Sequence, residues 1–381
     1  MKLAILDESK KQSNTMRTKN VTLTVYCVFA YWQYICAAQT SGYVIEWGSH
    51  DTFTGRARSA TLVLSNTLAI SAGRVQCLAL KDDGTVNAWS WNRKGEITFD
   101  NIVTTGGEGG DGKTSIKIPP EIWTNGVVKI DGQVLNNVIS VAEGSKFGIG
   151  LKRDGTLVTW GENYVPAGLT NVHAIAAASF ASLALKNDGT VVEWVSQKWL
   201  PQYGQLIEAP FGSNVIAIAI AETSQGTRSI ALKKDGTVVY WGEEAVYKDA
   251  TPPSGLRNVV AVAAGFNHSL ALTRDGTVTG WGFNYDGEAT GMPNTNFISV
   301  SSGQVTIDSQ VVSNVAAIAA GNGYSMALKR DGTIVTWGRI GNNHPATVPA
   351  GLSNVVAIAA GDNFCLAITT NRAVAERFRQ N

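Results

Sequence analysis

Charged residues are scarce in this chain of 381 residues: they make up 16%, against roughly 25% in an average soluble domain. The charges also nearly cancel, because 31 Lys and Arg stand against 30 Asp and Glu and leave a formal net charge of +1. Proteins whose main function is to bind nucleic acid or an anionic membrane carry a clear net positive charge, so the sequence argues against both classes.

Glycine, in contrast, is abundant, with 40 residues against a usual share of about 7%. Hydrophobic residues at 44% are enough for a sizeable core, which excludes a disordered chain. Few charges and many glycines together favour an all-β protein with many tight turns.

The N-terminal region has the layout of a secretory signal peptide. From Met16, basic residues precede an apolar run at Val21–Ile35, and small residues end at Ala38. This run is shorter than the roughly 20 residues of a membrane span. We therefore expect a leader over 1–38 that contains a signal peptide starting at Met16, with cleavage after Ala38. The mature protein would then be secreted, periplasmic or extracellular and free of the membrane. If 16–38 is an ordinary strand instead, the protein is cytoplasmic.

A hairpin-like motif recurs along the rest of the chain. Glycines of this motif, with Arg372 at the equivalent place in the last copy, follow one another at a mean interval of about 47 residues. The six regular copies have an Asp-Gly pair between two apolar runs, which predicts a two-residue turn. They are ALKDDGTVNAW (79–89), GLKRDGTLVTW (150–160), ALKNDGTVVEW (184–194), ALKKDGTVVYW (231–241), ALTRDGTVTGW (271–281) and ALKRDGTIVTW (327–337).

A second element precedes each hairpin and occurs seven times. Every copy opens with Asn and continues with small and β-branched residues, as a buried strand does. The copies are NTLAISAG (66–73), NVISVAEG (137–144), NVHAIAAA (171–178), NVIAIAIA (214–221), NVVAVAAG (258–265), NVAAIAAG (314–321) and NVVAIAAG (354–361).

This period, with three or four strands per copy, predicts a seven-bladed β-propeller over 39–381, with a long insertion at about 90–136. The first copy holds only a late strand, GYVIEWG (42–48), so we expect an N-terminal strand to complete the final blade and close the ring. Tyr43–Trp47 and Ala373–Phe378 compete for that one place.

The pattern NVVAIAAG…SLALTRDGTVTGWG, best kept at Asn258–Gly282, resembles the regulator of chromosome condensation repeat. The resemblance implies seven-bladed propellers that bind proteins. Its members include exchange factors for a nuclear small GTPase and bacterial secreted propellers, one of which inhibits β-lactamases, and we favour the bacterial secreted type. The partner is not selected by the fold.

One stretch matches a phosphate-binding loop by its letters. Gly107–Thr114 reads GEGGDGKT, but Pro119 and Pro120 follow closely and forbid the long helix that such a loop needs. Glu108 and Asp111 would also place negative charge in an anion cradle. We interpret the stretch as a glycine-rich insertion and expect no cofactor.

The repeated polar and aromatic residues have structural interpretations. One Asp per turn cannot supply the six to eight oxygens that calcium takes, so these residues serve the turns. The Trp that recurs once per copy packs the blades. The four histidines, which share no metal-ligand or catalytic spacing, are His50, His173, His268 and His344. We therefore expect no metal and no catalytic set.

Two cysteines remain after leader cleavage, Cys77 and Cys365, and both occupy a place that holds Ser in other copies. A disulfide that seals the ring is conceivable in an oxidising compartment, but equivalent places on neighbouring blades lie too far apart. Two buried thiols are the favoured interpretation.

A partner is expected to touch residues that differ between blades. The place just before the Ser or Cys predicts one ring near the axis, formed mainly by Phe147, Arg228, His268, Tyr324 and Phe364. The long connections supply a second set, Trp91, Trp123, Trp199, Tyr203, Phe283 and Tyr285.

The sequence thus predicts a monomeric, exported, non-enzymatic propeller that binds a protein through one face. One alternative is an intracellular, exchange-factor-like regulator of a small GTPase. Another is a carbohydrate-binding or hydrolytic propeller that uses its central funnel and needs clustered carboxylates. The acidic loop residues Glu162, Glu243, Glu244 and Glu288 are scattered and meet that condition poorly.

Overall fold

The computed structural model describes most of the chain from residue 41 onward. The described residues are 41–48, 58–74, 76–91, 97–98, 126–130, 132–144, 147–161, 165–166, 168–179, 181–195, 206–223, 226–242, 251–294, 300–340, 344–345 and 347–378. The predicted leader, Gly107–Thr114 and most of the predicted insertion lie outside these ranges.

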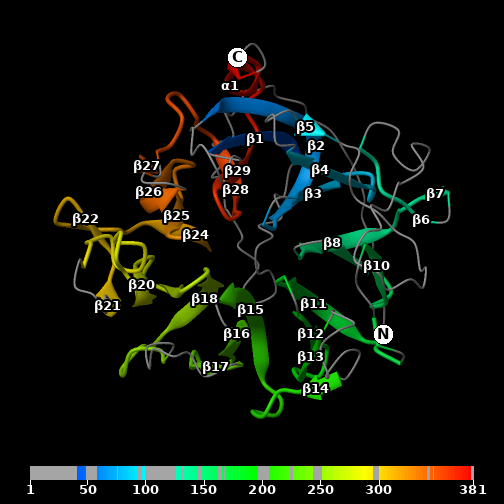
Figure 1. Ribbon diagram of the computed structural model, residues 1–381, viewed down its shortest axis with the longest axis horizontal. Coiled ribbons are helices and arrows are strands. Elements are labelled where there is room, and N and C mark those ends of the chain that lie inside the picture. Colours follow the sequence, from blue (N-terminus) through cyan, green and yellow to red (C-terminus); the bar gives the residue numbers. More distant parts are fainter. Residues whose placement is uncertain are drawn as a thin grey trace, which may run out of the picture.

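Antiparallel sheets stand around a central axis as the blades of a propeller (Figure 1). The described strands group into seven blades, each built outward from the axis. The innermost strands are β2 (Arg58–Ala72), β8 (Val138–Glu143), β11 (Val172–Ala177), β15 (Val215–Thr223), β18 (Val259–Ala264), β24 (Val315–Ala320) and β28 (Val355–Ala360). The second strands are β3 (Gln76–Lys81), β9 (Phe147–Lys152), β12 (Ala181–Lys186), β16 (Gly226–Lys233), β19 (His268–Thr273), β25 (Tyr324–Lys329) and β29 (Phe364–Thr369).

Third strands follow in every blade. Four blades have a described fourth strand of their own, and the first half of β2 is the fourth strand of the last blade. The third strands are β4 (Val86–Trp91), β10 (Leu157–Gly161), β13 (Val191–Val195), β17 (Val238–Gly242), β20 (Val278–Phe283), β26 (Ile334–Ile340) and β1 (Gly42–Gly48). The outer strands are β5 (Ile97–Thr98), β14 (Leu206–Glu208), β21 (Val300–Gln304) and β27 (His344–Pro345).

Short elements complete the fold. They are the hairpins β6 (Lys129–Ile130) with β7 (Gln133–Val134) and β22 (Thr306–Ile307) with β23 (Gln310–Val311), and the helix α1 (Arg372–Arg377). Among the described residues, no helix has the length and apolar character to cross a membrane.

The ring is closed by the N-terminal strand. β1 pairs with β29 from Tyr43↔Thr369 to Gly48↔Phe364 and so becomes the third strand of the last blade. The first half of β2 pairs with the other edge of β1, and the second half pairs with β3 in the first blade. The expected closure is confirmed, and the competition for this place is decided because residues 372–377 form α1 instead.

An Asn in the left-handed backbone region, with φ between 53° and 80°, directly precedes six of the inner strands, and Asn66 takes the same conformation inside β2, where the pairing passes from β1 to β3. Asn tolerates this conformation better than most residues that have a side chain. The seven residues are Asn66, Asn137, Asn171, Asn214, Asn258, Asn314 and Asn354.

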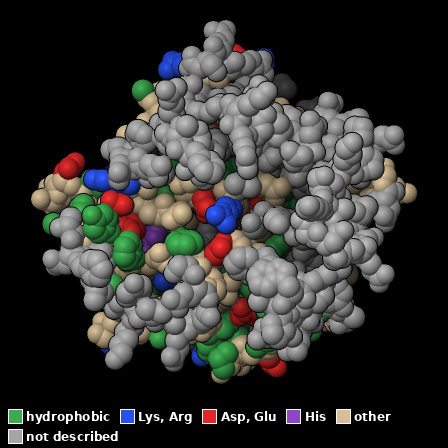
Figure 2. All heavy atoms as spheres, in the orientation of Figure 1, with side chains coloured by type: hydrophobic (Ala, Val, Ile, Leu, Met, Phe, Trp, Pro, Cys, Tyr) green, Lys and Arg blue, Asp and Glu red, His purple; other side chains and the backbone are tan. Residues whose placement is uncertain are grey.

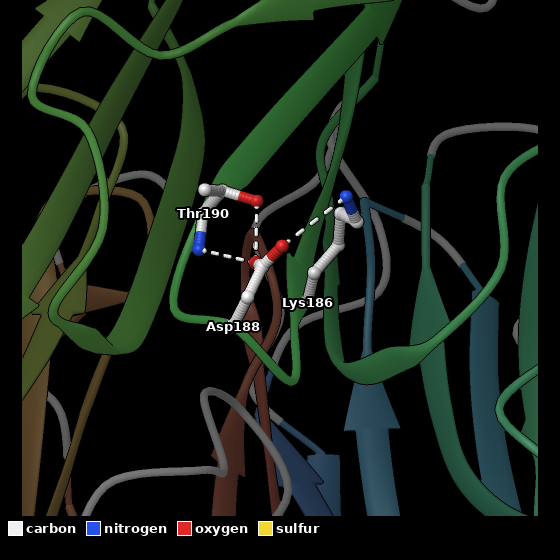
Figure 3. Close-up of polar contacts among 3 residues, drawn as sticks. All are labelled: Lys186, Asp188 and Thr190. Carbon is white, nitrogen blue, oxygen red and sulfur yellow. Dashed lines mark hydrogen bonds and ion pairs between the residues drawn. The ribbon is translucent and has the colours of Figure 1, made fainter.

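The Asp-Gly turns differ from the expected two-residue type. In the third blade, the Lys186 N–H donates to the Thr190 carbonyl at 2.9 Å, and the Gly189 N–H donates to the Lys186 carbonyl at 2.9 Å. The loop therefore has three residues, of which only Gly189 has a positive φ. The cause is visible in Figure 3: Asp188 Oδ1 accepts from both the N–H (2.9 Å) and the hydroxyl (2.6 Å) of Thr190.

The same turns join neighbouring blades. The Gly189 carbonyl accepts a hydrogen bond of 3.2 Å from the N–H of Val215, the first residue of the next inner strand. A Cβ on Gly189 would lie 2.8 Å from the backbone nitrogen of Asn214. The equivalent bond recurs at Val138–Gly84, Val172–Gly155, Val315–Gly276 and Val355–Gly332.

The hydrophobic core lies between the blades. One cluster, for example, combines Leu78 and Val86 of the first blade with Val141 and Trp160 of the second. The recurring Trp faces the Ser, Cys or Gly position across each hairpin, and the indole of Trp89 donates to Glu46 Oε2 of the preceding blade at 2.9 Å. Its predicted packing role is confirmed.

Cys77 and Cys365 are free and buried, as predicted. Burial raises the pKa of both thiols well above the ordinary value. Both thiols are therefore neutral at physiological pH and behave as small core residues.

Two glycine substitutions test how much the close contact between blades contributes to stability. Gly189→Ala combines a positive φ of 81° with the collision against Asn214, whereas Gly168→Ala has φ 82° and nothing within 4 Å of the new Cβ. We expect Gly168→Ala to lower the free energy of unfolding by about 1 kcal/mol. Gly189→Ala should cost about 1–3 kcal/mol more. Urea unfolding measures both, and equal losses would contradict the contact.

Candidate binding face and axial cavity

The predicted ring of partner-contacting residues is buried. Phe147, Arg228, His268, Tyr324 and Phe364 expose between 0% and 5% of their surface. The ring does form near the axis, but a partner cannot touch side chains that the neighbouring blades already cover. The expectation of exposed contacts at these five positions is therefore corrected.

These residues join each blade to the next. The Tyr324 hydroxyl shares its one proton between the carbonyls of Gly361 (3.0 Å) and Phe364 (2.5 Å) in the following blade. Burial raises the pKa of Tyr324, so this hydroxyl keeps its proton and remains a donor. The residue type at this position differs between blades because each pair of neighbouring blades is joined by a different kind of contact.

Arg228 and His268 make equivalent junctions. The Arg228 guanidinium donates to the carbonyls of Gly265 (3.0 Å) and His268 (3.2 Å) in the next blade. His268 Nε2 lies 2.8 Å from the Ser325 hydroxyl, one blade further on. Burial, with Arg228 as a second cause, lowers the pKa of His268 to about 3, so the imidazole is neutral at physiological pH.

The second predicted set is partly described. Phe283 and Tyr285 stack with ring centroids 6.5 Å apart, and Tyr285 is 48% exposed. Met292, which the sequence analysis did not single out, is 60% exposed in the same loop. The side chain of Trp91 and the residues Trp123, Trp199 and Tyr203 lie outside the described part of the chain.

The loop that carries Tyr285 and Met292, here called the 284–294 loop, has a fixed shape. Asn284 Oδ1 accepts from the N–H groups of Ala289 and Thr290 at 2.9 Å each, and its amide donates to the Met292 carbonyl at 2.7 Å. Because these bonds already fix the loop, little conformational entropy is lost when a partner binds its two exposed apolar side chains.

The same loop is tied to the next blade. Asp286 forms an ion pair with Arg339 at 3.3 Å. The Glu288 carbonyl accepts from the indole of Trp337 (2.9 Å) and the hydroxyl of Ser325 (2.8 Å). Burial raises the pKa of the Glu288 carboxyl to about 7.

A cavity of about 80 Å³ opens on the axis of this face. It is lined by the ends of all seven inner strands and the turns that follow them. Figure 2 shows the face: a basic side chain lies against acidic ones at its centre, and hydrophobic side chains gather over the blade of β18–β21. This site was not predicted from the sequence, although one signal was available: the residue that follows the repeated Gly or Ala varies between blades, as at Arg74, Glu222 and Asp362.

The rim of the cavity is charged. Arg74 and Asp362, each directly after that Gly, form an ion pair at 3.4 Å. Burial raises the pKa of Asp362 to about 6, although Arg74 opposes the shift, and nearby Glu222 adds to it. Glu222 accepts a hydrogen bond from the hydroxyl of Ser179. Residues from three blades that are far apart in the sequence therefore place charges of opposite sign around one opening.

A third carboxylate lies deeper. Glu143 is 4% exposed, and neither of its carboxylate oxygens has a hydrogen-bond partner among the described residues. Burial raises the pKa of the Glu143 carboxyl well above its ordinary range. A buried acid without partners lowers stability and marks this position as more than a packing residue.

Replacement of Glu143 by Ala should stabilise the protein. We expect Glu143→Ala to raise the free energy of unfolding by about 1–2 kcal/mol near pH 8, because it removes an unsatisfied buried group. A carboxyl whose pKa is raised on folding stabilises the protein below its unfolded pKa of about 4.3 and loses that contribution as pH rises. The gain should therefore shrink toward pH 4.

Urea unfolding at both pH values measures this difference, with the exposed Glu208→Ala as the matched control. The control should change stability by less than about 0.5 kcal/mol. The groups that share the cavity with Glu143 are Arg74, Glu222 and Asp362, and Cys77 lies close enough to interact with it. A gain that is the same at both pH values would contradict the raised pKa.

The comparisons with known proteins agree with the fold. The regulator of chromosome condensation (RCC1) repeat matches residues 259–288, which include β18, β19 and β20. Kap60-bound yeast RCC1 (Prp20) is similar in structure, with a TM-score of 0.59, 16% identity and coverage of 98% of each chain. Human WBSCR16 gives a TM-score of 0.58 at 15% identity and covers 87% of this chain and 99% of its own.

These identities establish likeness of fold alone. No curated protein sequence matches the chain. The chain is an all-β propeller that carries the regulator of chromosome condensation repeat, as its sequence pattern predicted.

Proposed function

We propose that this protein is a non-enzymatic propeller that binds a protein partner through the face that carries the axial cavity. One observation carries the proposal: the 284–294 loop holds Tyr285 and Met292 exposed in a fixed shape beside a charged axial rim. Aromatic residues and Met are enriched at protein interfaces, and a polar rim around apolar anchors is their usual arrangement.

The loop and the cavity belong to one continuous face. The Phe283 N–H donates to the Asn267 carbonyl at 2.9 Å, and the adjacent Phe266 lines the cavity. Phe266 in turn donates from its N–H to the carbonyl of Gly321, another lining residue. A partner seated on the loop therefore reaches the axis without crossing another blade.

The similar yeast RCC1 structure contains a protein partner, Kap60, which supports protein binding as a use of this fold. Exchange-factor-like regulation of a small GTPase is the first alternative, and purified small GTPases are therefore among the candidate partners to be captured on the immobilised chain. Likeness in fold does not favour that partner over others.

A ligand-binding or hydrolytic funnel is the second alternative. Glu143, Glu222 and Asp362 gather around one opening, which is the clustering of carboxylates that this function requires. Hydrolysis of a glycan by the purified chain, lost in Asp362→Asn, would replace the proposed function with this one.

The binding face is tested with two double variants of the full chain. We expect Tyr285→Ala with Met292→Ala to weaken binding of a captured partner about tenfold or more, since exposed anchors of this kind dominate interface energy. Val134→Ala with Val311→Ala is the matched control. Both residues are exposed, and their hairpins β6–β7 and β22–β23 precede the starts of inner strands, whereas the axial cavity is lined by the ends of the inner strands.

Binding by surface plasmon resonance measures both variants against the unchanged chain. Loss of binding in the Tyr285→Ala, Met292→Ala variant with normal binding in the control variant supports the proposed face. The reverse result moves the interface to the opposite face of the ring. Equal binding by all three chains would overturn the role of the 284–294 loop.

We also propose that the protein is exported, on the layout of residues 16–38 described above. Expression of the full chain with a C-terminal tag in a bacterial host should give exported protein whose N-terminus is Gln39. Ala38→Arg should block this cleavage, because signal peptidase requires a small residue at that place. An intact N-terminus on cytoplasmic protein would contradict export.

A further inference from the structure

Glu143 departs from the repeat at a position that is otherwise apolar. The strand register fixes its equivalents, because each faces the Ser, Cys or Gly position across the hairpin, as Glu143 faces Gly148. The equivalents in the other six blades are Ala72, Ala177, Ile220, Ala264, Ala320 and Ala360.

The neighbouring blade makes room for this side chain. A Cβ on Gly73 would lie 2.6 Å from Glu143 Cγ, so the glycine leaves the space that the longer residue fills. The backbone N–H of Glu143 donates to the Ser71 hydroxyl at 3.1 Å, which fixes the strand while the carboxylate stays without a partner among the described residues. The site therefore presents a buried, unsatisfied acid at a defined place in the cavity wall.

Exposure decreases from the rim to Glu143. At the rim, the side chain of Arg74 is 56% exposed and that of Asp362 is 29% exposed. Alanines make up much of the remaining lining, as at Ala142, Ala176 and Ala264. At about 10–15 Å³ for each water-sized group, 80 Å³ holds roughly five to eight of them.

We propose that this cavity binds a primary ammonium group on an aliphatic stem, as in a lysine side chain, with the Glu143 carboxylate as its counter-ion. The alanine walls cover the stem, and the charge meets Glu143, a buried acid whose carboxylate has no partner among the described residues. Burial of an ionised carboxylate requires such a cation, so the empty and occupied forms of Glu143 differ in protonation.

The donor set favours an ammonium over other ligands. Among the described residues, no three His, Cys, Asp or Glu side chains are placed to hold a metal ion. An anion would meet Glu143, Glu222 and Asp362 in the same opening. A guanidinium is planar and wide, whereas an ammonium is a compact charge on an unbranched stem and suits a narrow apolar channel.

Two sources supply this chemistry: a lysine of the protein partner or a free amine. The first rests on the proposed function, because the cavity opens on the proposed binding face. The ammonium site itself does not depend on it, so the two can fail separately.

The experiment titrates the full chain with n-butylammonium, which copies the lysine side chain, and with the neutral n-butanol, by protein-observed NMR. We expect n-butylammonium to bind, and Glu143→Gln to weaken it about tenfold, which is a loss of about 1.4 kcal/mol. Butanol should bind both chains weakly and equally. Equal affinity of the two chains for n-butylammonium, or equal binding of butanol and the amine by the unchanged chain, would overturn the site.

Two further variants keep the test independent of folding. Glu143→Ala restores the residue of five other blades and should fold and lose binding, as Glu143→Gln does. Arg74→Ala removes a like charge from the rim and should strengthen binding about twofold to threefold. Weakened binding in Arg74→Ala would indicate that loss of rim structure, rather than charge, governs affinity, and would contradict the proposal.

The pH dependence supplies a separate readout. Burial raises the pKa of the Glu143 carboxyl, and an ammonium group pairs with its ionised form, so ammonium binding should release a proton and strengthen as the pH rises from 6 to 8 in the unchanged chain. Among the described residues, Asp362, Glu222, Arg74 and Cys77 are the other ionisable groups near the site, and they remain in Glu143→Gln. The strengthening should therefore vanish in that variant, and its persistence there would assign the proton to another group.

The source is decided with N-acetyl-lysine methylamide, which carries the same ammonium on a peptide backbone. Binding at least as tight as that of n-butylammonium supports a lysine of a polypeptide partner. Binding of the free amine alone overturns the lysine source and leaves a small-amine site, whether or not the proposed protein-binding function holds.

Discussion

The close approach of each turn to the next inner strand is the constraint on which the ring depends. At Gly189 the turn carbonyl accepts from Val215 of the next blade, and a side chain on the glycine would strike the backbone at Asn214. The Asn that directly precedes six of the inner strands adopts a positive φ that brings its strand into this contact. One repeated pair of residue types thus fixes the spacing of blades, and the tryptophans and aliphatic residues fill the space that remains.

Variation between blades serves two purposes in this molecule. At Arg228, His268 and Tyr324 it changes how one blade is joined to the next while the side chains stay buried. At Arg74 and Asp362, directly after the inner strands, it changes which charges line the axial opening. Only the second kind of variation is available to a partner, because the first is enclosed between neighbouring blades.

The candidate site joins a rigid loop to a cavity of unusual charge. Asn284 holds the loop in shape through three hydrogen bonds, so Tyr285 and Met292 are presented without ordering on contact. Glu143 adds a buried carboxylate that no described neighbour satisfies. The fold bears the energetic cost of that group, as proteins often do at functional positions.

The sequence by itself determined the all-β propeller, the repeated turn and the packing role of the Trp, because these follow from local patterns that recur in every blade. It predicted closure by a terminal strand but left Tyr43–Trp47 and Ala373–Phe378 in competition, which the pairing of β1 with β29 decided. The sequence pattern predicted a two-residue turn, since the extra hydrogen bond that Asp188 accepts from Thr190 leaves no mark in the spacing of the repeat. Tertiary structure alone decided which variable positions are exposed and brought Glu143, Glu222 and Asp362 to one opening. Burial between blades depends on contacts between residues far apart in the chain, and a periodic pattern carries no information about those contacts.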